Sequence, residues 1–394
     1  MNAASPAPGR ASSRAALAEA IADLPLVDDH VHGALRDDPL DTADFSRHIA
    51  ETDRPAPPGT TWFDTLLGVS LRRWCAPLLD IAPDAHPDTY FSRRVALGAE
   101  EVTRRMLHAS GITHYLLDTG YRGSEIHGLD GMRQASGVAV DEVVRLETTA
   151  EEVAASGTNA EGFADAFTQW LHERTVHAVG TKSVAAYRYG LNLAPDRPTT
   201  REVADAAGTW LRRDEGTGRW RVDDPVLLRF LVWAALDRGL PLQFHTGMGD
   251  PDLHLARADP TCLTDLIKAA EPTKTEIVLL HCYPFHRNAA YLSRMFTYVS
   301  MDVGEALNYV GARAPAVVAE TLEVVPFHKL MFSSDAWGPA ELHYLGALQW
   351  RRAMTRVLSE LVDDDELSVD QALAIAGQVA SGTARRVYRL PNPA

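Results

Sequence analysis

The sequence predicts an α/β protein that folds as one (β/α)₈ TIM barrel with a long insertion after the first strand. Short apolar segments with strand character alternate with helical patterns along the 394 residues, which is typical of parallel α/β folds. Histidine, lysine and aspartate side chains stand at the ends of several of these segments, where barrel enzymes place their active sites. An open doubly wound sheet would also show strands that alternate with helices. However, only His32-Gly33 follows the first strand, without a glycine-rich phosphate loop.

The elements follow one another without an internal repeat or a linker-like change in composition. Strands are predicted at 24–33, 112–118, 138–146, 179–184, 241–246, 276–281, 297–302 and 330–334. Helices are predicted at 88–110, 161–176, 200–211, 225–238, 262–270, 286–295, 305–324, 343–361 and 368–386. We expect residues 1–22 to form an N-terminal extension that becomes helical, and residues 23–394 to form a single barrel domain.

The insertion covers residues 34–87 and is rich in proline and aspartate, with a helical middle at 62–80. An insertion directly after a strand that ends in histidines is well placed to act as a lid or as a wall of a pocket. A surface excursion packed by its own aromatic side chains is an equally good interpretation.

Composition and charge restrict the function classes. The 53 acidic and 38 basic residues give a formal charge of −15, which argues against binding to nucleic acid or to an anionic membrane. The three cysteines, Cys75, Cys262 and Cys282, are too few and too widely spaced for a disulfide framework or a cysteine zinc site. Neither a signal peptide nor a membrane span is recognisable, so a cytoplasmic protein is expected.

The first strand ends in two histidines, His30 and His32, within LPLVDDHVHG. Side chains alternate between the two faces of a strand, so both imidazoles leave on the same side. Neutral imidazole is a common ligand of Zn, Mn, Fe and Ni. Taken alone, such a pair is more often a chance feature of a polar surface.

Four further candidate residues stand at later strand ends: Lys182 on the fourth strand, His245 on the fifth, His281 on the sixth, and Asp335 just after the eighth. Singly, a histidine there is usually a hydrogen-bonded loop residue, and an aspartate is usually a helix cap. Alternation predicts that these side chains point into the barrel, and their joint occurrence indicates one site at its mouth.

These residues and their surroundings resemble the amidohydrolase superfamily of metal-dependent barrel enzymes. The resemblance rests on His30-Val-His32, on QFHTG around His245, on LLHCYPF around His281 and on MFSSDA around Asp335. The segments GTKSVAAYRYGL and FSSDAW are most similar to sequences of the amidohydrolase-2 branch. Within that branch they are most similar to the domains that occur fused to glutamine-synthetase-like domains.

The resemblance implies that His30, His32, His245 and Asp335 bind a divalent metal. Zinc is expected, with manganese or iron as alternatives; one ion is favoured over two, and such a metal activates water and polarises a carbonyl group. Asp335 would then act as general base and acid. His281 would orient the water or the carbonyl oxygen, or ligate a second ion.

Lys182 has two open interpretations. In relatives with two metals a carboxylated lysine from the fourth strand bridges the ions, and Lys182 stands at a matching place. The alternative, slightly preferred, is an ammonium group that pairs with Asp335 or with a substrate anion. Arg188, beside Tyr187, is a candidate clamp for a substrate carboxylate, although a surface salt bridge explains it equally well.

The expected function is hydrolysis of an amide-type C–N bond in a small molecule. The same metal site also fits a non-oxidative decarboxylase or a uronate-isomerase-like enzyme, and a non-catalytic barrel scaffold is the remaining alternative. The substrate is expected to be a small molecule, and the chain is expected to form a homo-oligomer.

Overall fold

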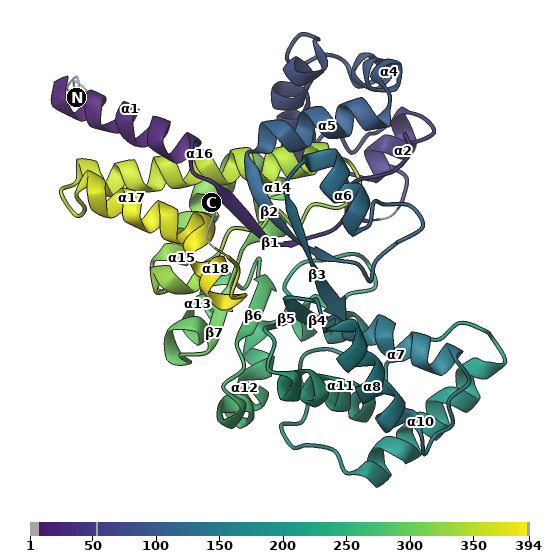
Figure 1. Ribbon diagram of the computed structural model, residues 1–394. Coiled ribbons are helices and arrows are strands. Elements are labelled where there is room, and N and C mark those ends of the chain that lie inside the picture. Colours follow the sequence, from purple (N-terminus) through teal and green to yellow (C-terminus); the bar gives the residue numbers. More distant parts are fainter. Residues whose placement is uncertain (1–7, 53, 392–394) are drawn as a thin grey trace.

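The computed structural model describes residues 8–52 and 54–391. Its centre is a curled sheet of seven parallel strands in the order of the sequence, surrounded by helices (Figure 1). The strands are β1 (Leu26–Val31), β2 (Ile112–Asp118), β3 (Ala139–Arg145), β4 (Gly180–Ser183), β5 (Leu242–Thr246), β6 (Ile277–His281) and β7 (Val299–Met301). Each predicted strand from the first to the seventh is therefore present.

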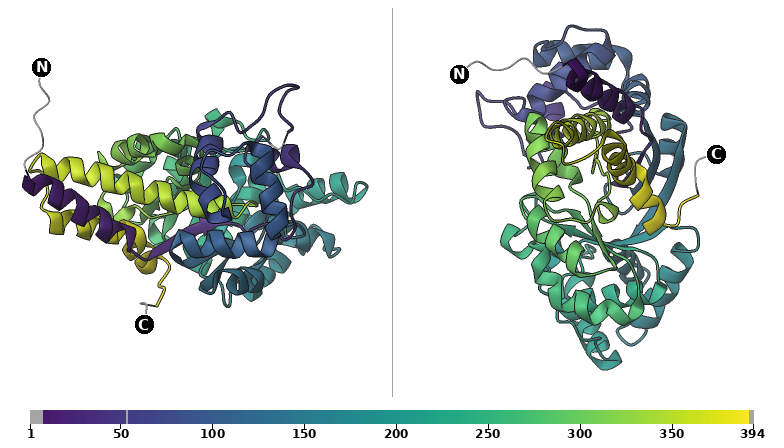
Figure 2. Two further views of the ribbon diagram at one scale, coloured as in Figure 1. Left: turned by 90° about the horizontal axis from the view of Figure 1, so that it is seen from above. Right: turned by 90° about the vertical axis from the view of Figure 1, so that its left-hand side faces the viewer.

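The helices flank and cover this sheet. They are α1 (Pro8–Ala22), α2 (Thr42–Arg47), α3 (Leu66–Ser70), α4 (Pro87–Leu97), α5 (Ala99–Ser110), α6 (Leu129–Ser136), α7 (Leu146–Ala155), α8 (Phe163–Arg174), α9 (Ala185–Arg188), α10 (Thr200–Glu215), α11 (Pro225–Arg238), α12 (Thr264–Ala270), α13 (His286–Met295), α14 (Gly304–Val310), α15 (Ala314–Leu322), α16 (Glu341–Asp363), α17 (Val369–Gly377) and α18 (Thr383–Val387). Helices α1, α16 and α17 lie side by side and project from one side of the molecule (Figure 2). None of the described helices is long and apolar enough to cross a membrane.

The segment 330–334, predicted as the eighth strand, does not form a regular strand. Its ladder is reduced to a single parallel bridge between Leu330 and Met301 at the edge of β7. On the other side, the carbonyl oxygen of Phe332 accepts a hydrogen bond from the amide of Asp29 in β1 at 3.1 Å. The segment therefore occupies the gap between the last and the first strand.

Hydrogen bonds that involve serine and aspartate side chains take the place of the missing β-ladder between segment 330–334 and β1. The amide of Ser334 donates to Oδ1 of Asp28 at 2.9 Å, and the hydroxyl of Ser333 donates to the carbonyl of His30 at 2.8 Å. Such side-chain bonds to backbone compete with regular pairing, which explains why the eighth strand is lost although its position is kept. They place Asp335 beside the histidines of β1.

Two predicted helices are interrupted, and both breaks coincide with a glycine in the left-handed region. The predicted helix 88–110 divides into α4 and α5 at Gly98, whose φ is 84°, and the predicted helix 305–324 is broken at Gly311, whose φ is 48°. Such φ values suit glycine because it lacks a Cβ atom. Helices α2, α6, α7 and α9 were not predicted.

The insertion is fixed to the barrel by a buried ion network. Arg94 on α4 donates from Nε to Oε1 of Glu341 on α16 at 3.0 Å and also pairs with Asp38 of the insertion. Tyr90 donates to the same Glu341 oxygen at 3.0 Å. Arg94 and Glu341 are 1% and 0% exposed, so this network lies in the core.

Replacing Glu341 with alanine should lower the free energy of unfolding by about 3–5 kcal/mol, because it leaves the buried Arg94 guanidinium with Asp38 alone and removes the acceptor of the Tyr90 hydroxyl. The matched control is Glu360→Ala, which breaks the exposed pair with Arg356 on the same helix and should change stability by less than about 1 kcal/mol. Urea denaturation followed by circular dichroism measures both. Equal effects of the two substitutions would contradict the prediction.

Candidate metal centre

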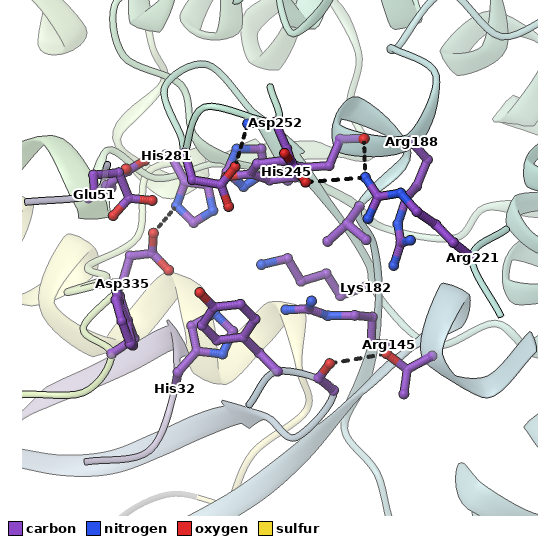
Figure 3. Close-up of a pocket in the computed structure, with 18 of the residues that line it drawn as sticks. His32, Glu51, Arg145, Lys182, Arg188, Arg221, His245, Asp252, His281 and Asp335 are labelled. Atoms are coloured by element: carbon purple, nitrogen blue, oxygen red, sulfur yellow. Dashed lines mark hydrogen bonds and ion pairs between the residues drawn. The ribbon is translucent and has the colours of Figure 1, made fainter. Parts of the chain in front are cut away.

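The carboxyl ends of the strands surround a cavity of about 390 Å³ (Figure 3). Its wall includes these residues predicted from the sequence: His32, Lys182, Tyr187, Arg188, His245, His281 and Asp335. His30 is fully buried just behind this wall. The fold thus brings together all the residues that were expected to form the site.

The imidazole of His30 has a defined orientation and tautomer. Its Nδ1 lies 3.0 Å from Oε1 of Gln243 on β5. The Gln243 amide is itself fixed, because its nitrogen donates at 2.7 Å to the carbonyl of Asp29 and to the hydroxyl of Tyr388. The glutamine oxygen can only accept, so Nδ1 of His30 carries the proton and Nε2 presents a lone pair to the site.

His32 and His245 are oriented by backbone carbonyl groups in the same way. Nδ1 of His32 donates to the carbonyl of Asp118 at 3.2 Å, and Nε2 of His245 donates to that of Met248 at 2.9 Å. Each ring therefore keeps one nitrogen available. Burial lowers the pKa of His32 to about 4 and lowers the pKa of His30 and His245 well below their ordinary value. All three are neutral at neutral pH, as metal ligation requires.

Asp335 lies between two histidines. One carboxylate oxygen is 3.4 Å from Nε2 of His30, and the other is 3.0 Å from Nδ1 of His281. The second contact is close enough for an ion pair but is not aligned as a hydrogen bond, so Nδ1 of His281 is a buried polar atom without a hydrogen-bond partner among the described residues. Asp335 and His281 both have left-handed backbones, with φ of 44° and 66°. Such conformations are strained and concentrate at functional sites.

The two carboxyl groups near the histidines differ in their electrostatics. Burial raises the pKa of Asp335 to about 6, although the charge of Lys182 opposes this. Burial alone would also raise the pKa of Asp118, but the charges of Arg145 and Lys182 hold it well below its ordinary value. Asp118 is therefore a permanent anion, whereas Asp335 is able to exchange a proton near neutral pH.

Lys182 is 2% exposed and its Nζ lies 2.6 Å from Nε2 of His30 and 3.6 Å from Asp118. Asp118 also accepts two bonds from Arg145 at 2.7 and 3.1 Å. Lys182 thus pairs with Asp118, whereas the sequence predicted Asp335 or a substrate anion as its partner. Burial lowers the pKa of Lys182, which makes its neutral form more accessible.

These residues fit a divalent metal ion. Two groups of three side chains have ligand atoms that all lie within 4.8 Å of one another: His30, His32 and Asp118, and His30, His281 and Asp335. Neutral imidazoles with carboxylates suit zinc and other first-row cations. Nδ1 of His281, which makes no hydrogen bond within the described residues, offers a further ligand atom. His245 belongs to neither group within the described chain, although its ring centroid is 4.6 Å from that of His281.

The two residues predicted to bind substrate lie in the cavity wall in different roles. Arg188 is paired with Glu151 at 3.0 Å, and Tyr187 packs on His245 with ring centroids 4.5 Å apart. Arg188 therefore forms a largely buried salt bridge in the cavity wall, not one at the surface, and its role as a clamp for a substrate carboxylate stays a prediction.

Several residues of the site were not identified from the sequence, among them Asp118, Arg145, Gln243, Glu51 and Glu305. Asp118 ends a strand, so the strand-end argument that selected Lys182 applies to it equally. Gln243 lies on the same face of its strand as His245, and this shared face could have identified Gln243 from the sequence. Glu51 lies in the insertion and Glu305 in a helix after β7, where no sequence pattern marks them.

The family model described as amidohydrolase matches residues 143–390, which is more than half of the chain and includes Lys182, His245, His281 and Asp335. The chain belongs to the amidohydrolase family. This amidohydrolase is also similar to protein fluG of Emericella nidulans, with 34% identity over 225 residues. That match covers 54% of the present chain and 26% of fluG, so the chain spans about a quarter of the relative's length.

Solved structures agree with this assignment. A protein of Lactobacillus casei described as a metal-dependent hydrolase is similar over 95% of this amidohydrolase and 97% of its own chain, with a TM-score of 0.84 and 26% identity. A uronate isomerase of Bacillus halodurans is similar over 100% of this chain and 98% of its own, with a TM-score of 0.65 and 13% identity. The second likeness shows the shared fold alone.

Proposed function

We propose that this amidohydrolase cleaves a C–N bond of a small-molecule amide with the help of a bound divalent metal. The position of Asp335, whose two carboxylate oxygens lie 3.4 Å from Nε2 of His30 and 3.0 Å from Nδ1 of His281, carries the proposal. A carboxyl group held at the reacting centre is able to take a proton and to return it in the same cycle.

His30, His32, His245 and Asp335 are the residues proposed to hold the metal, with His281 as the alternative to His245. When bound, the ion supplies an activated water and polarises the carbonyl group of the substrate. Gln243 and two backbone carbonyl groups hold three of the imidazoles in the required orientation, which is the usual task of such outer partners.

The chain's own groups then move the proton. Asp335 accepts a proton from the attacking water while the new C–O bond forms. It returns that proton to the amide nitrogen, so that the C–N bond breaks and a neutral amine leaves. His281, whose buried Nδ1 lies 3.0 Å from Asp335 but makes no hydrogen bond within the described part of the chain, is proposed to hydrogen-bond the reacting oxygen. Asp118 keeps Lys182 and Arg145 in the wall beside the reacting group.

Within the family, we propose that the chain belongs with the domains found fused to glutamine-synthetase-like domains and that γ-glutamyl-type amides are among its substrates. The similarity in GTKSVAAYRYGL and FSSDAW supports this narrower assignment.

The test combines metal analysis with a substrate panel. We expect about one equivalent of zinc, manganese or iron in protein purified without chelator, and amine release from an anilide, a γ-glutamyl amide or a cyclic amide. Near two equivalents would indicate a carboxylated Lys182 bridge. Release of CO₂ from hydroxybenzoates without amine release from any amide would replace the hydrolase with a decarboxylase. No metal after reconstitution would support the scaffold alternative.

A further inference from the structure

One wall of the cavity is acidic and is not used by the chemistry proposed above. It consists of Glu51 from the insertion and Glu305 from α14, both of which line the cavity. Glu305 is 4% exposed, and neither of its carboxylate oxygens has a hydrogen-bond partner among the described residues. A buried carboxylate without partners is costly, so its position at a cavity points to a ligand that is a donor or a cation.

Tyr309 contacts one of the two carboxyl groups. Its hydroxyl donates to Oε2 of Glu51 at 2.7 Å. Glu305 and Tyr309 are four residues apart on α14, so they lie on the same face of that helix. Glu51 has a φ of 36°, a left-handed conformation that is rare outside glycine and is retained where the side chain is needed. The acidic wall is therefore a built feature of the cavity.

The electrostatics of this wall favour a cation. Burial raises the pKa of Glu51 to about 7, and burial together with the charge of Glu51 raises the pKa of Glu305. A positive group between the two would favour their ionised forms and form charge-assisted hydrogen bonds with them. An anionic group would add to the repulsion.

The cation is better explained as an organic ammonium than as a further metal ion. Across the described chain, groups of three potential metal ligands with donor atoms within 4.8 Å occur only around His30, and neither of them contains Glu51 or Glu305. An ammonium group has three donors and is satisfied by a few acceptors at hydrogen-bond distance. Figure 3 shows Glu51 beside His281, on the opposite side of the cavity from Arg188 and Arg221. Those arginines are paired with Glu151 and Asp252, whereas Glu305 has no such partner among the described residues.

We propose that the substrate carries a protonated primary amine, bound by Glu51 and Glu305, a few bonds away from the amide that is cleaved. The role in a substrate rests on the amide hydrolysis proposed above. The preference for an ammonium group is a property of the cavity itself and is measurable without turnover.

The experiment compares amides that differ only in that amine. Isothermal titration calorimetry at pH 8.5 of the protein as purified measures binding of 3-aminopropanamide, 4-aminobutanamide and 5-aminopentanamide, each against propanamide, butanamide or pentanamide. We expect at least one amino amide to bind about tenfold more tightly than its neutral counterpart, as for a hydrogen-bonded charged group. Equal binding within all three pairs would overturn the proposal.

Two substitutions test whether the acidic wall causes the tighter binding of the amino amides. Glu305→Gln and Glu51→Gln should each remove most of this preference while leaving the binding of the neutral amides unchanged, which also shows that the variants are folded. The control Asp252→Asn, at an exposed part of the same cavity, should keep the preference. A preference that survives both glutamate substitutions would reject the proposal. A preference without cleavage of any amide would support this site and reject only the reaction.

Discussion

Replacing Asp335 with asparagine is expected to lower kcat for amide cleavage by about 10²- to 10⁴-fold, the usual contribution of a general acid–base. Asparagine keeps the size of the side chain and an oxygen able to face His30 or His281, but it is unable to accept and return a proton. We therefore expect kcat to fall far more than the affinity for substrate. Steady-state kinetics on the best amide of the panel, with metal content measured on the same preparation, tests this.

The control for this substitution is Asp252→Asn, which removes a carboxylate from the outer part of the same cavity, where Asp252 is 71% exposed and lies 3.6 Å from Arg221. Its kcat should stay within about threefold of the parent protein, because surface substitutions away from a reacting group cost little. An Asp335→Asn protein that retains its metal and cleaves amides at the parental rate would remove Asp335 from the mechanism.

The fold was predictable where local patterns decide it. Seven strands were identified because each is a short apolar run, and the helix breaks were missed because an amphipathic pattern continues through Gly98 and Gly311. The segment 330–334 has the same apolar pattern as a strand. However, its pairing is determined by Asp28, about 300 residues earlier in the chain, through the bonds to Ser334. Such a long-range partner is not visible in the local sequence.

The residues of the candidate site also differ in how far the sequence predicts them. His30, His32, His245, His281 and Asp335 were found because strand ends converge in a barrel, and convergence is a property of topology. The partner of Lys182 was misjudged because pairing depends on distances within the cavity, where Asp118 is nearer. Glu305 became recognisable only through its burial and its missing hydrogen bonds within the described residues, and Glu51 only through its place in the cavity wall. No sequence displays these features.

Replacing His30 with alanine is expected to remove the metal from the protein as purified. His30 contributes to both groups of clustered ligand atoms, so its loss leaves neither of them complete. The matched variant is Gln243→Leu, which keeps the imidazole but removes the acceptor of its Nδ1 proton. That variant should bind metal about 10- to 100-fold more weakly, the typical effect of an outer partner, and His30→Ala should lose more than this.

The two variants together separate ligation from orientation. Metal content by elemental analysis and metal affinity by competition with a chelator are the measurements, and circular dichroism verifies that both proteins are folded. If His30 is a ligand, the order of affinity is the parent protein, then Gln243→Leu, then His30→Ala. If Gln243→Leu weakens metal binding as much as His30→Ala does, His30 contributes to metal binding only through its hydrogen bond to Gln243. A full equivalent of metal in His30→Ala would place the ion elsewhere, because both clusters of ligand atoms depend on that ring.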